Sequence, residues 1–244
     1  MRILILSDIH SNIVALETVL ADAGSFDTLW CLGDTIGYGP APNECIELMR
    51  QHATIMLTGN HDLACLGKIN LNDFNPDARR ANLWNGSQLK PANREWMLPL
   101  QPAHAVDKTY YLAHGSPREP IWEYLLMPSQ ALANLEWFHQ PVCFIGHSHV
   151  QFAFRCPNGE DRCERIIPEG NSQITLTSDA RYFINPGSVG QPRDHDPRAA
   201  YAILDTEKQT LTFKRVVYDV QRTQEQMRSY GLPATLIYRL SVGM

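Results

Sequence analysis

The sequence has no long hydrophobic run, no block of like charges and no excess of positive charge. No segment approaches the roughly 18 apolar residues of a membrane-spanning helix, so we expect no membrane anchor. The four apolar residues that follow Arg2 are too few for a signal peptide. Lysine and arginine total 21 against 26 aspartates and glutamates, a formal net charge of −5. This balance argues against binding of nucleic acid through a broad basic face.

The six cysteines also lack a pattern, because no two of them form a CxxC pair. Cys31 and Cys143 lie inside apolar runs, where a free buried thiol is the usual finding. Cys156 and Cys163 flank a turn at 157–160. A disulfide or a metal pair at these two positions is the less favoured alternative, and we expect free thiols in a reducing cytoplasm.

What the sequence does have is a 44% hydrophobic content in 244 residues, enough for a sizeable core. The first sixty residues alternate between apolar strand-like runs and amphipathic helical stripes. This alternation predicts an α/β sheet. The expected elements are strands at 2–6, 28–32 and 54–57, a helix that follows Ser11 as its cap and runs to about Ala23, and a helix from Pro42 to about His52.

The pattern changes twice after residue 63. The segment from about residue 64 to 102 contains many dipeptides that favour turns, such as Asn75-Pro76. It predicts a helical insertion of two or three short helices. Strands are expected at 110–113 and 142–145, with a helix at 129–139 between them. From Val150 onward hairpins predominate, and a helix at 219–230 ends at Gly231-Leu232-Pro233. No linker-like composition divides the chain, so we expect a single domain over residues 1–244.

Polar side chains follow five of these strands at the point where each strand ends. Ligands of open α/β sheets bind beyond the carboxyl ends of the strands. Any one of these residues, taken alone, is more often a turn residue or a helix cap. Together they predict a shared site of two aspartates, one asparagine and five histidines. The residues are Asp8 and His10, Asp34, Asn60 and His61, His114, and His147 and His149.

This donor set mixes carboxylate and amide oxygens with imidazole nitrogens. Such a mixture suits Mn, Fe, Zn or Ni better than Mg or Ca. The ligands are too many for one tetrahedral zinc, whereas two ions that share a carboxylate would use them all. Asp8 and His10 are two residues apart, and so are His147 and His149. If these segments are extended, each pair projects to one side.

The motifs Asp8-x-His10, Gly33-Asp34, Gly59-Asn60-His61-Asp62, His114 and Gly146-His147-x-His149 together resemble the calcineurin-like metallophosphoesterase superfamily. Residues 33–40 and 185–190 resemble its bacterial branch of predicted phosphoesterases and diadenosine-tetraphosphatase-like proteins. The resemblance implies an α/β fold (α+β by some schemes). The expected architecture is a four-layer αββα sandwich of two mixed β-sheets flanked by helices.

The resemblance also implies roles for individual residues. Asp8, His10, Asp34 and His149 would hold a first metal ion, and Asp34, Asn60, His114 and His147 would hold a second. His61 would contact the substrate phosphate and act as the catalytic general acid. The implied cofactors are two divalent transition-metal ions, with Mn favoured for activity. A hydroxide bridging the ions would attack phosphorus.

The sequence departs from the family's phosphoprotein phosphatases, which carry an aspartate and an arginine where this chain has Gly37 and Tyr38. Protein phosphatase activity is therefore not expected. Arg193 is a candidate phosphate clamp or a plain surface arginine, and it joins Asn60 and His61 as an expected substrate-binding residue. Asp62 either orients a neighbour or serves as a helix cap or a salt-bridge partner.

The expected substrate is a small phosphate ester, either a phosphodiester or a nucleotide-type compound. A phosphomonoesterase and a non-catalytic metal-binding scaffold remain as alternatives. A metallo-β-lactamase-type hydrolase is disfavoured because the HxHxDH cluster is missing. We expect no membrane and no nucleic-acid partner, and the sequence does not choose an oligomeric state.

Overall fold

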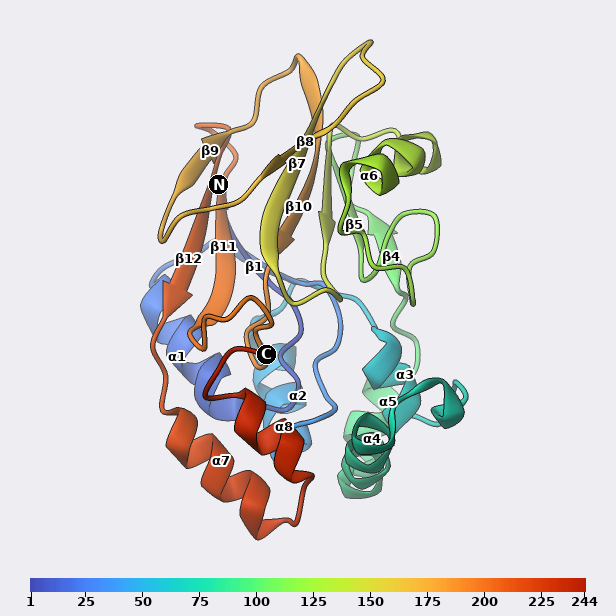
Figure 1. The fold of residues 1–244 in the computed structure, drawn as a ribbon, viewed down its shortest axis with the longest axis vertical. Helices are drawn as coiled ribbons and strands as arrows, with labels where there is room; N and C mark the ends of the chain where they lie inside the picture. Colours follow the sequence, from blue (N-terminus) through green and yellow to red (C-terminus); the bar gives the residue numbers. More distant parts are fainter.

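The computed structural model describes all of residues 1–244 and arranges twelve strands in two six-stranded sheets (Figure 1). In the order of pairing, the first sheet contains β3 (Ile55–Met56), β2 (Thr28–Cys31), β1 (Arg2–Leu6), β11 (Ala199–Asp205), β12 (Thr210–Val216) and β9 (Gln173–Thr175). The second contains β4 (Ala103–Ala105), β5 (Tyr110–Ala113), β6 (Val142–Ile145), β10 (Ala180–Pro186), β7 (Gln151–Pro157) and β8 (Glu164–Ile166). Both sheets are mixed, since each combines parallel and antiparallel pairs.

Eight helices surround the sheets. They are α1 (Ile13–Ala23), α2 (Pro42–His52), α3 (Asn60–Cys65), α4 (Pro76–Gln88), α5 (Pro91–Met97), α6 (Pro128–Asn134), α7 (Val220–Ser229) and α8 (Ala234–Arg239). Two short 3-10 helices, at Leu71–Asp73 and Leu135–Trp137, complete the set. None of the helices combines the length and the apolar character needed to cross a membrane.

The alternation of side chains along β1 shows how the layers form. Ile3 and Ile5 point into the core between the two sheets, where they join Trp30, Tyr182 and other residues from both sheets. Leu4 and Leu6 point the other way and are covered by α1 and α2. A strand buried on both faces needs this continuous apolar sequence. On the far side, α6 packs against the outer face of the second sheet. The expected four-layer αββα sandwich is confirmed.

The helical insertion and the C-terminal helices form a further layer below the sheets (Figure 1). The insertion contains α4, α5 and the end of α3, with Ala78 and Ala81 of α4 packed against Leu236 and Ile237 of α8. Tyr38, from the loop after β2, lies in the same cluster. Figure 1 shows the C-terminus at the lower end of the sheets, close to α8. The C-terminal segment therefore returns to the edge of the sheets where β1 ends.

Several expected boundaries are wrong. The N-cap of α1 is Asn12, whose side chain accepts a hydrogen bond from the amide of Ala15, and not Ser11. The hydroxyl of Ser11 is already used, because it donates to Asn85 of α4 at 2.6 Å. The helix expected at 129–139 stops at Asn134 and continues as a 3-10 turn. β4 and α8 were not expected at all.

The expectation of free thiols at the hairpin turn is also wrong. Cys156 and Cys163 form a disulfide with their Cα atoms 4.1 Å apart. The pairing of β7 with β8 brings the two ends of the turn together, so the geometry of the hairpin places the thiols side by side. The other four cysteines, Cys31 and Cys143 among them, are free and buried.

Candidate metal centre

The candidate site lies where strands of both sheets end. β1, β2 and β3 run parallel in the first sheet, and β5 and β6 run parallel in the second. Parallel strands bring their carboxyl ends to one edge, which places the loops after all five strands together. Seven side chains named from the sequence meet there and are buried. They are Asp8, His10, Asp34, Asn60, His114, His147 and His149.

The seven side chains fall into two neighbouring groups. Asp8, His10 and His149 form the first, with the Nε2 atoms of the two histidines 3.0 Å apart. Nε2 of His149 lies 3.3 Å from Oδ1 of Asp8. The three candidate ligand atoms of this group lie within 4.8 Å of one another, and the same holds for the second group. This spacing suits one bound cation in each group.

Asp34, His114 and His147 form the second group, and Asn60 adjoins it. The amide oxygen of Asn60 lies 3.2 Å from Nε2 of His114. Oδ2 of Asp34 is 3.4 Å from Nε2 of His114 and 3.7 Å from Nε2 of His10, which belongs to the first group. Asp34 thus stands between the two groups, in the position that a bridging carboxylate would take.

The backbone at these positions is not extended as the sequence suggested. Asp8, His10, Asp34, His147 and His149 all have positive φ, between 49° and 64°. Residues other than glycine adopt this left-handed backbone region at a cost in conformational energy, and residues in this conformation cluster at functional sites. The expectation of extended segments is wrong, because the chain turns sharply just after each of these strands. The side chains nevertheless converge.

Hydrogen bonds from the outer nitrogens fix the orientation of three imidazole rings. Nδ1 of His10 faces the carbonyl of Ile36 at 3.3 Å, and Nδ1 of His114 faces that of Leu32 at 2.9 Å. Nδ1 of His149 faces the carbonyl of Gln191 at 2.6 Å. A carbonyl can only accept, so Nδ1 carries the proton when the ring is neutral. The lone pair of Nε2 is then directed into the site, as in metal-bound histidines.

Glycines make room for this convergence. A Cβ on Gly59 would lie 2.1 Å from Oδ1 of Asp34 and 2.7 Å from Cε1 of His114. A Cβ on Gly146 would lie 2.0 Å from the hydroxyl oxygen of Ser7 and 3.1 Å from Oδ2 of Asp8. No larger residue fits at either position without moving the site.

Three buried atoms at the centre have no hydrogen-bond partner. They are Oδ1 of Asp8, Oδ2 of Asp34 and Nε2 of His147. The second oxygen of each aspartate is satisfied, since Oδ2 of Asp8 accepts from the amide of His147 and Oδ1 of Asp34 accepts from the amide of His61. Unpaired polar atoms are rare in protein interiors because their desolvation is costly. Carboxylate and imidazole atoms left free in this way fit divalent transition-metal ions.

The pKa shifts of the buried side chains also indicate a centre that needs positive charge. Burial raises the pKa of Asp8 to about 7. Burial opposes ionisation of Asp34 as well, but the imidazoles of His114 and His61 outweigh it and hold the pKa of that carboxyl well below its usual range. Burial also opposes protonation of His114, yet the Asp34 carboxylate raises its pKa to about 9. Without cations, the centre therefore depends on a proton on His114 to offset Asp34.

Comparison with known proteins agrees with this arrangement. The family model of the calcineurin-like phosphoesterase superfamily domain matches residues 1–209. The chain belongs to the calcineurin-like phosphoesterase superfamily. A crystal structure of a metallophosphoesterase from Sphaerobacter thermophilus is 46% identical, with a TM-score of 0.90 over 100% of this chain and 99% of that one.

Two further relatives span nearly the whole chain. The uncharacterized protein MJ0912 of Methanocaldococcus jannaschii is 38% identical over 99% of this chain and 98% of its own length. The crystal structure of the hypothetical protein PH1004 from Pyrococcus horikoshii OT3 shares the fold, with a TM-score of 0.77 at 18% identity, over 100% of this chain and 98% of that one.

In this calcineurin-like phosphoesterase, His61 lies beside the candidate metal ligands. Its ring is hydrogen-bonded to a residue that the sequence motifs did not indicate. Nδ1 of His61 is 2.9 Å from Oδ1 of Asn82, a fully buried residue of α4. The ring of His61 packs against those of His10, Tyr38 and Phe74. Asn82 thus fixes the His61 ring from α4. Its distance from the motifs along the chain explains why no local signal revealed it.

Asp62 is a cap that also links two loops of the calcineurin-like site. It lies in the first turn of α3 and accepts hydrogen bonds from the amides of Gly59 and Ile36, both at 3.0 Å. Burial, reinforced by the nearby Asp34 carboxylate, raises the pKa of Asp62 to about 7. The structure therefore shows Asp62 as part of the N-terminal cap of α3.

Arg193 reaches the site from the loop after β10. Its amide donates to the carbonyl of His149 at 3.2 Å, and its guanidinium lies over the ring of Tyr38. Nη2 donates to the hydroxyl of Tyr38 at 3.2 Å and to Oε1 of Gln191 at 3.0 Å. It forms no ion pair with a carboxylate, so its charge is available beside the candidate metal ligands.

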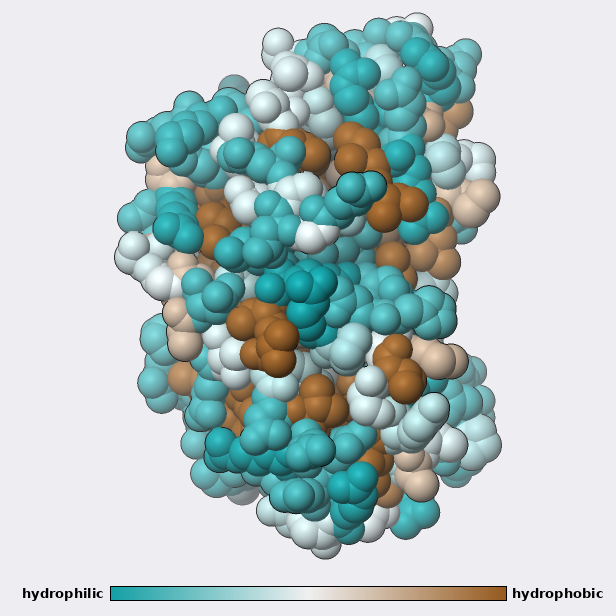
Figure 2. Space-filling model, turned by 60° about the vertical axis from the view of Figure 1, so that its left-hand side comes forward, coloured by the Kyte–Doolittle hydropathy of each residue, from teal (hydrophilic) through white to brown (hydrophobic).

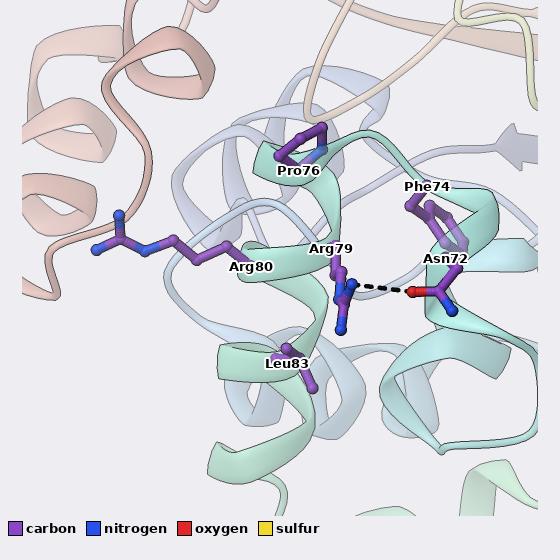
Figure 3. Close-up of a pocket in the computed structure, with 6 residues that line it drawn as sticks. All are labelled: Asn72, Phe74, Pro76, Arg79, Arg80 and Leu83. Carbon is purple, nitrogen blue, oxygen red and sulfur yellow. Dashed lines mark hydrogen bonds between the residues drawn. The ribbon is translucent and has the colours of Figure 1, made fainter.

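A surface groove of about 400 Å³ borders the calcineurin-like site on the insertion (Figure 3). Phe74 lines it and also touches the ring of His61. Arg79 donates a hydrogen bond to Asn72 across the groove, whereas the guanidinium of Arg80, which also lines the groove, points away from these two residues and donates to the carbonyl of Gly231 (Figure 3). None of the seven candidate ligands lines this groove, so it lies outside the metal centre.

Proposed function

We propose that this protein hydrolyses a small phosphate ester, a phosphodiester or a nucleotide-type compound, with two divalent transition-metal ions at the centre. The observation that carries the proposal is the set of buried, unpartnered atoms on Asp8, Asp34 and His147. They adjoin histidines whose outer nitrogens are already anchored. Such a centre is costly to fold unless cations occupy it.

The residues divide naturally between two ions. Asp8, His10 and His149 would hold the first ion, and His114, His147 and Asn60 would hold the second, with Asp34 shared. When bound, the ions act as Lewis acids that polarise the phosphoryl oxygens and make a water nucleophilic near neutral pH. Manganese is the metal we favour for activity. Four positive charges from two divalent ions exceed the two negative charges of Asp8 and Asp34, so the centre attracts an anionic phosphate.

The chain itself supplies orientation and protons. Asn60 and Arg193 border the place where the phosphate would bind, and the planar guanidinium of Arg193 can donate two hydrogen bonds to it. Burial lowers the pKa of His61 to about 4, so the ring is neutral at pH 7 in the free protein. A bound phosphate anion favours the protonated ring. Because Asn82 accepts the proton of Nδ1, the added proton is carried by Nε2 and can pass to the leaving oxygen.

The test is hydrolysis of p-nitrophenyl phosphate and of its bis-ester by protein loaded with Mn²⁺. The proposal expects preferential cleavage of the bis-ester; preference for the monoester would instead identify a phosphomonoesterase. Cleavage of neither compound at full metal occupancy would identify a non-catalytic scaffold and refute the proposal.

The role of His61 is tested by the variant His61→Ala, which should lose about 10²- to 10⁴-fold in kcat while keeping both ions. His52, an exposed histidine at the end of α2, provides the matched control, and His52→Ala should leave kcat unchanged. Wild-type turnover in His61→Ala would remove His61 from the mechanism.

A further inference from the structure

Two arginines without a carboxylate partner converge beside the metal centre. Arg193 follows β10, and Arg239 is the last residue of α8. Nη2 of Arg193 donates to Oε1 of Gln191 at 3.0 Å, and Nη1 of Arg239 approaches the same oxygen at 3.5 Å. The neutral amide oxygen of Gln191 therefore accepts hydrogen bonds from two positively charged guanidinium groups. We call Arg193 and Arg239 the arginine pair.

No carboxylate forms an ion pair with either member of the arginine pair, although the field of Asp8 reaches Arg193. Nε of Arg193 is closed off from solvent and has no hydrogen-bond partner. The other contacts of its guanidinium are the hydroxyl and the ring of Tyr38, which are neutral. Asp77 is the acidic residue whose field reaches Arg239, but its carboxylate accepts a hydrogen bond from Thr235 and forms no ion pair with Arg239. Nε of Arg193 is buried and Arg239 is partly buried, and charges removed from solvent are normally paired, so the arginine pair lacks a bonded counter-anion.

The arginine pair is continuous with the metal centre. The amide of Arg193 bonds the carbonyl of His149. Tyr38, which receives a hydrogen bond from Arg193, packs on the rings of His10 and His61 at centroid distances of 4.7 and 4.2 Å. Arg193 is thus the inner member, next to the candidate ligands, and Arg239 is the outer member. An anion bound between the two guanidiniums would lie beside the phosphate at the metal centre.

Arg239 comes from a part of the chain that the family domain does not include. The match to the calcineurin-like domain ends at residue 209, whereas α8 begins at Ala234. Leu236, Ile237 and Leu240 anchor this helix against Tyr38 and α4. The second positive charge beside Arg193 therefore comes from the C-terminal segment of the chain.

We propose that the arginine pair is a second anion site, which binds a further phosphate group of the substrate next to the one that is hydrolysed. This inference rests on the proposed function and narrows it to esters that carry at least two phosphate groups, such as nucleoside diphosphates and longer polyphosphates. Arg193 contacts both phosphates. Arg239 contacts only the outer one and determines specificity.

The test compares two nucleotides that differ by one phosphate. Calorimetry would measure binding of adenosine 5′-monophosphate and of its non-hydrolysable α,β-methylene diphosphate analogue to the Mn²⁺-loaded protein, with free Mn²⁺ held constant against chelation. The wild-type protein should bind the diphosphate about 10- to 100-fold more tightly, the contribution of charge-assisted hydrogen bonds to one more phosphate. Arg239→Ala and the longer Arg239→Gln should both lose this preference, with the affinity for the monophosphate unchanged.

Arg228→Ala is the matched control, because it removes the same charge from an exposed position of α7 in the same C-terminal segment. It should keep the preference for the diphosphate. Equal binding of the two nucleotides by the wild-type protein would overturn the inference, and so would an equal loss of affinity for both in the Arg239 variants. Calorimetry needs no turnover, so failure of the hydrolytic function would show separately in the p-nitrophenyl assays.

Discussion

Replacing Gly59 by alanine tests whether the crowding around Asp34 serves to hold metal ions. Gly59 is the N-cap of α3, and its φ of −112° is one that any residue adopts. The substitution therefore adds a methyl group without straining the backbone. That methyl would lie 2.1 Å from Oδ1 of Asp34, whereas real Cβ atoms essentially never approach another heavy atom closer than 3.0 Å.

The carboxylate of Asp34 must then move by about 0.9 Å, from 2.1 to 3.0 Å. Metal–ligand distances tolerate only about 0.2 Å. A displacement of about 1 Å in an active site costs roughly 100-fold in rate. We expect Gly59→Ala to lose at least one ion and about 100-fold or more in kcat/KM. The metal-free protein should be destabilised by about 1–3 kcal/mol, the usual cost of overpacking.

Elemental analysis after loading with excess Mn²⁺, thermal unfolding with and without metal, and turnover of p-nitrophenyl esters would check this prediction. Gly24→Ala is the contrasting control, because Gly24 has a φ of 65° and nothing within 4 Å of its added methyl. It should cost about 1–3 kcal/mol of stability through backbone strain, because its ψ of −138° combined with a positive φ suits glycine alone, and it should leave metal content and turnover unchanged. If Gly59→Ala kept two ions and wild-type turnover, the steric reasoning would be refuted.

Two further predictions concern the protons and the positioning of the site. Asn82→Ala removes the acceptor of the His61 ring and should lower kcat about 10- to 100-fold with both ions retained, as kinetics and metal analysis would show; an unchanged kcat would contradict this role. Metal binding should release protons at pH 6.5, because Asp8 and His114 have pKa values of about 7 and about 9 and must lose their protons to act as ligands. Both groups are more fully protonated at lower pH, so metal affinity should rise between about pH 6 and 9. Calorimetry in two buffers of different ionisation enthalpy measures the released protons, and a release of none would exclude this reading.

Much of the fold could be predicted because it depends on local patterns. The continuous apolar run at 2–6 and the helical stripe that ends at Ala23 set β1 and α1 close to where they lie. Pro42 marks the start of α2, as proline does at the first turn of helices. The polar residues after each strand could be assigned to one edge because the direction of the strands follows from the alternation with helices.

Other features depend on contacts between distant parts of the chain. Asn12 caps α1 because the neighbouring Ser11 is drawn to Asn85 of the insertion. β4 is a three-residue strand, Ala-His-Ala, with no strand pattern of its own, and it forms by pairing with β5. The face of the molecule in Figure 2 is largely hydrophilic, with separate hydrophobic patches.

The residues missed at the site share the same cause. Asn82 and Arg239 lie on helices far from the motifs in sequence, and each acquires its role from what it contacts. Asn82 meets His61 because α4 packs beside α3, and Arg239 meets Gln191 because α8 is anchored on Tyr38. The left-handed backbone at Asp8 and at His147 is likewise set by the loops that must fit together at the edge of both sheets.

The most direct test of the account is the number of metal ions bound by the wild-type protein and by Asp34→Asn, each saturated with Mn²⁺, freed of excess metal and measured by mass spectrometry of the elements. Because Asp34 lies between the two ligand groups, we predict two ions per chain in the wild-type protein and at most one in the variant. At most one ion in the wild-type protein, or two ions retained in Asp34→Asn, would contradict a centre built around a shared carboxylate.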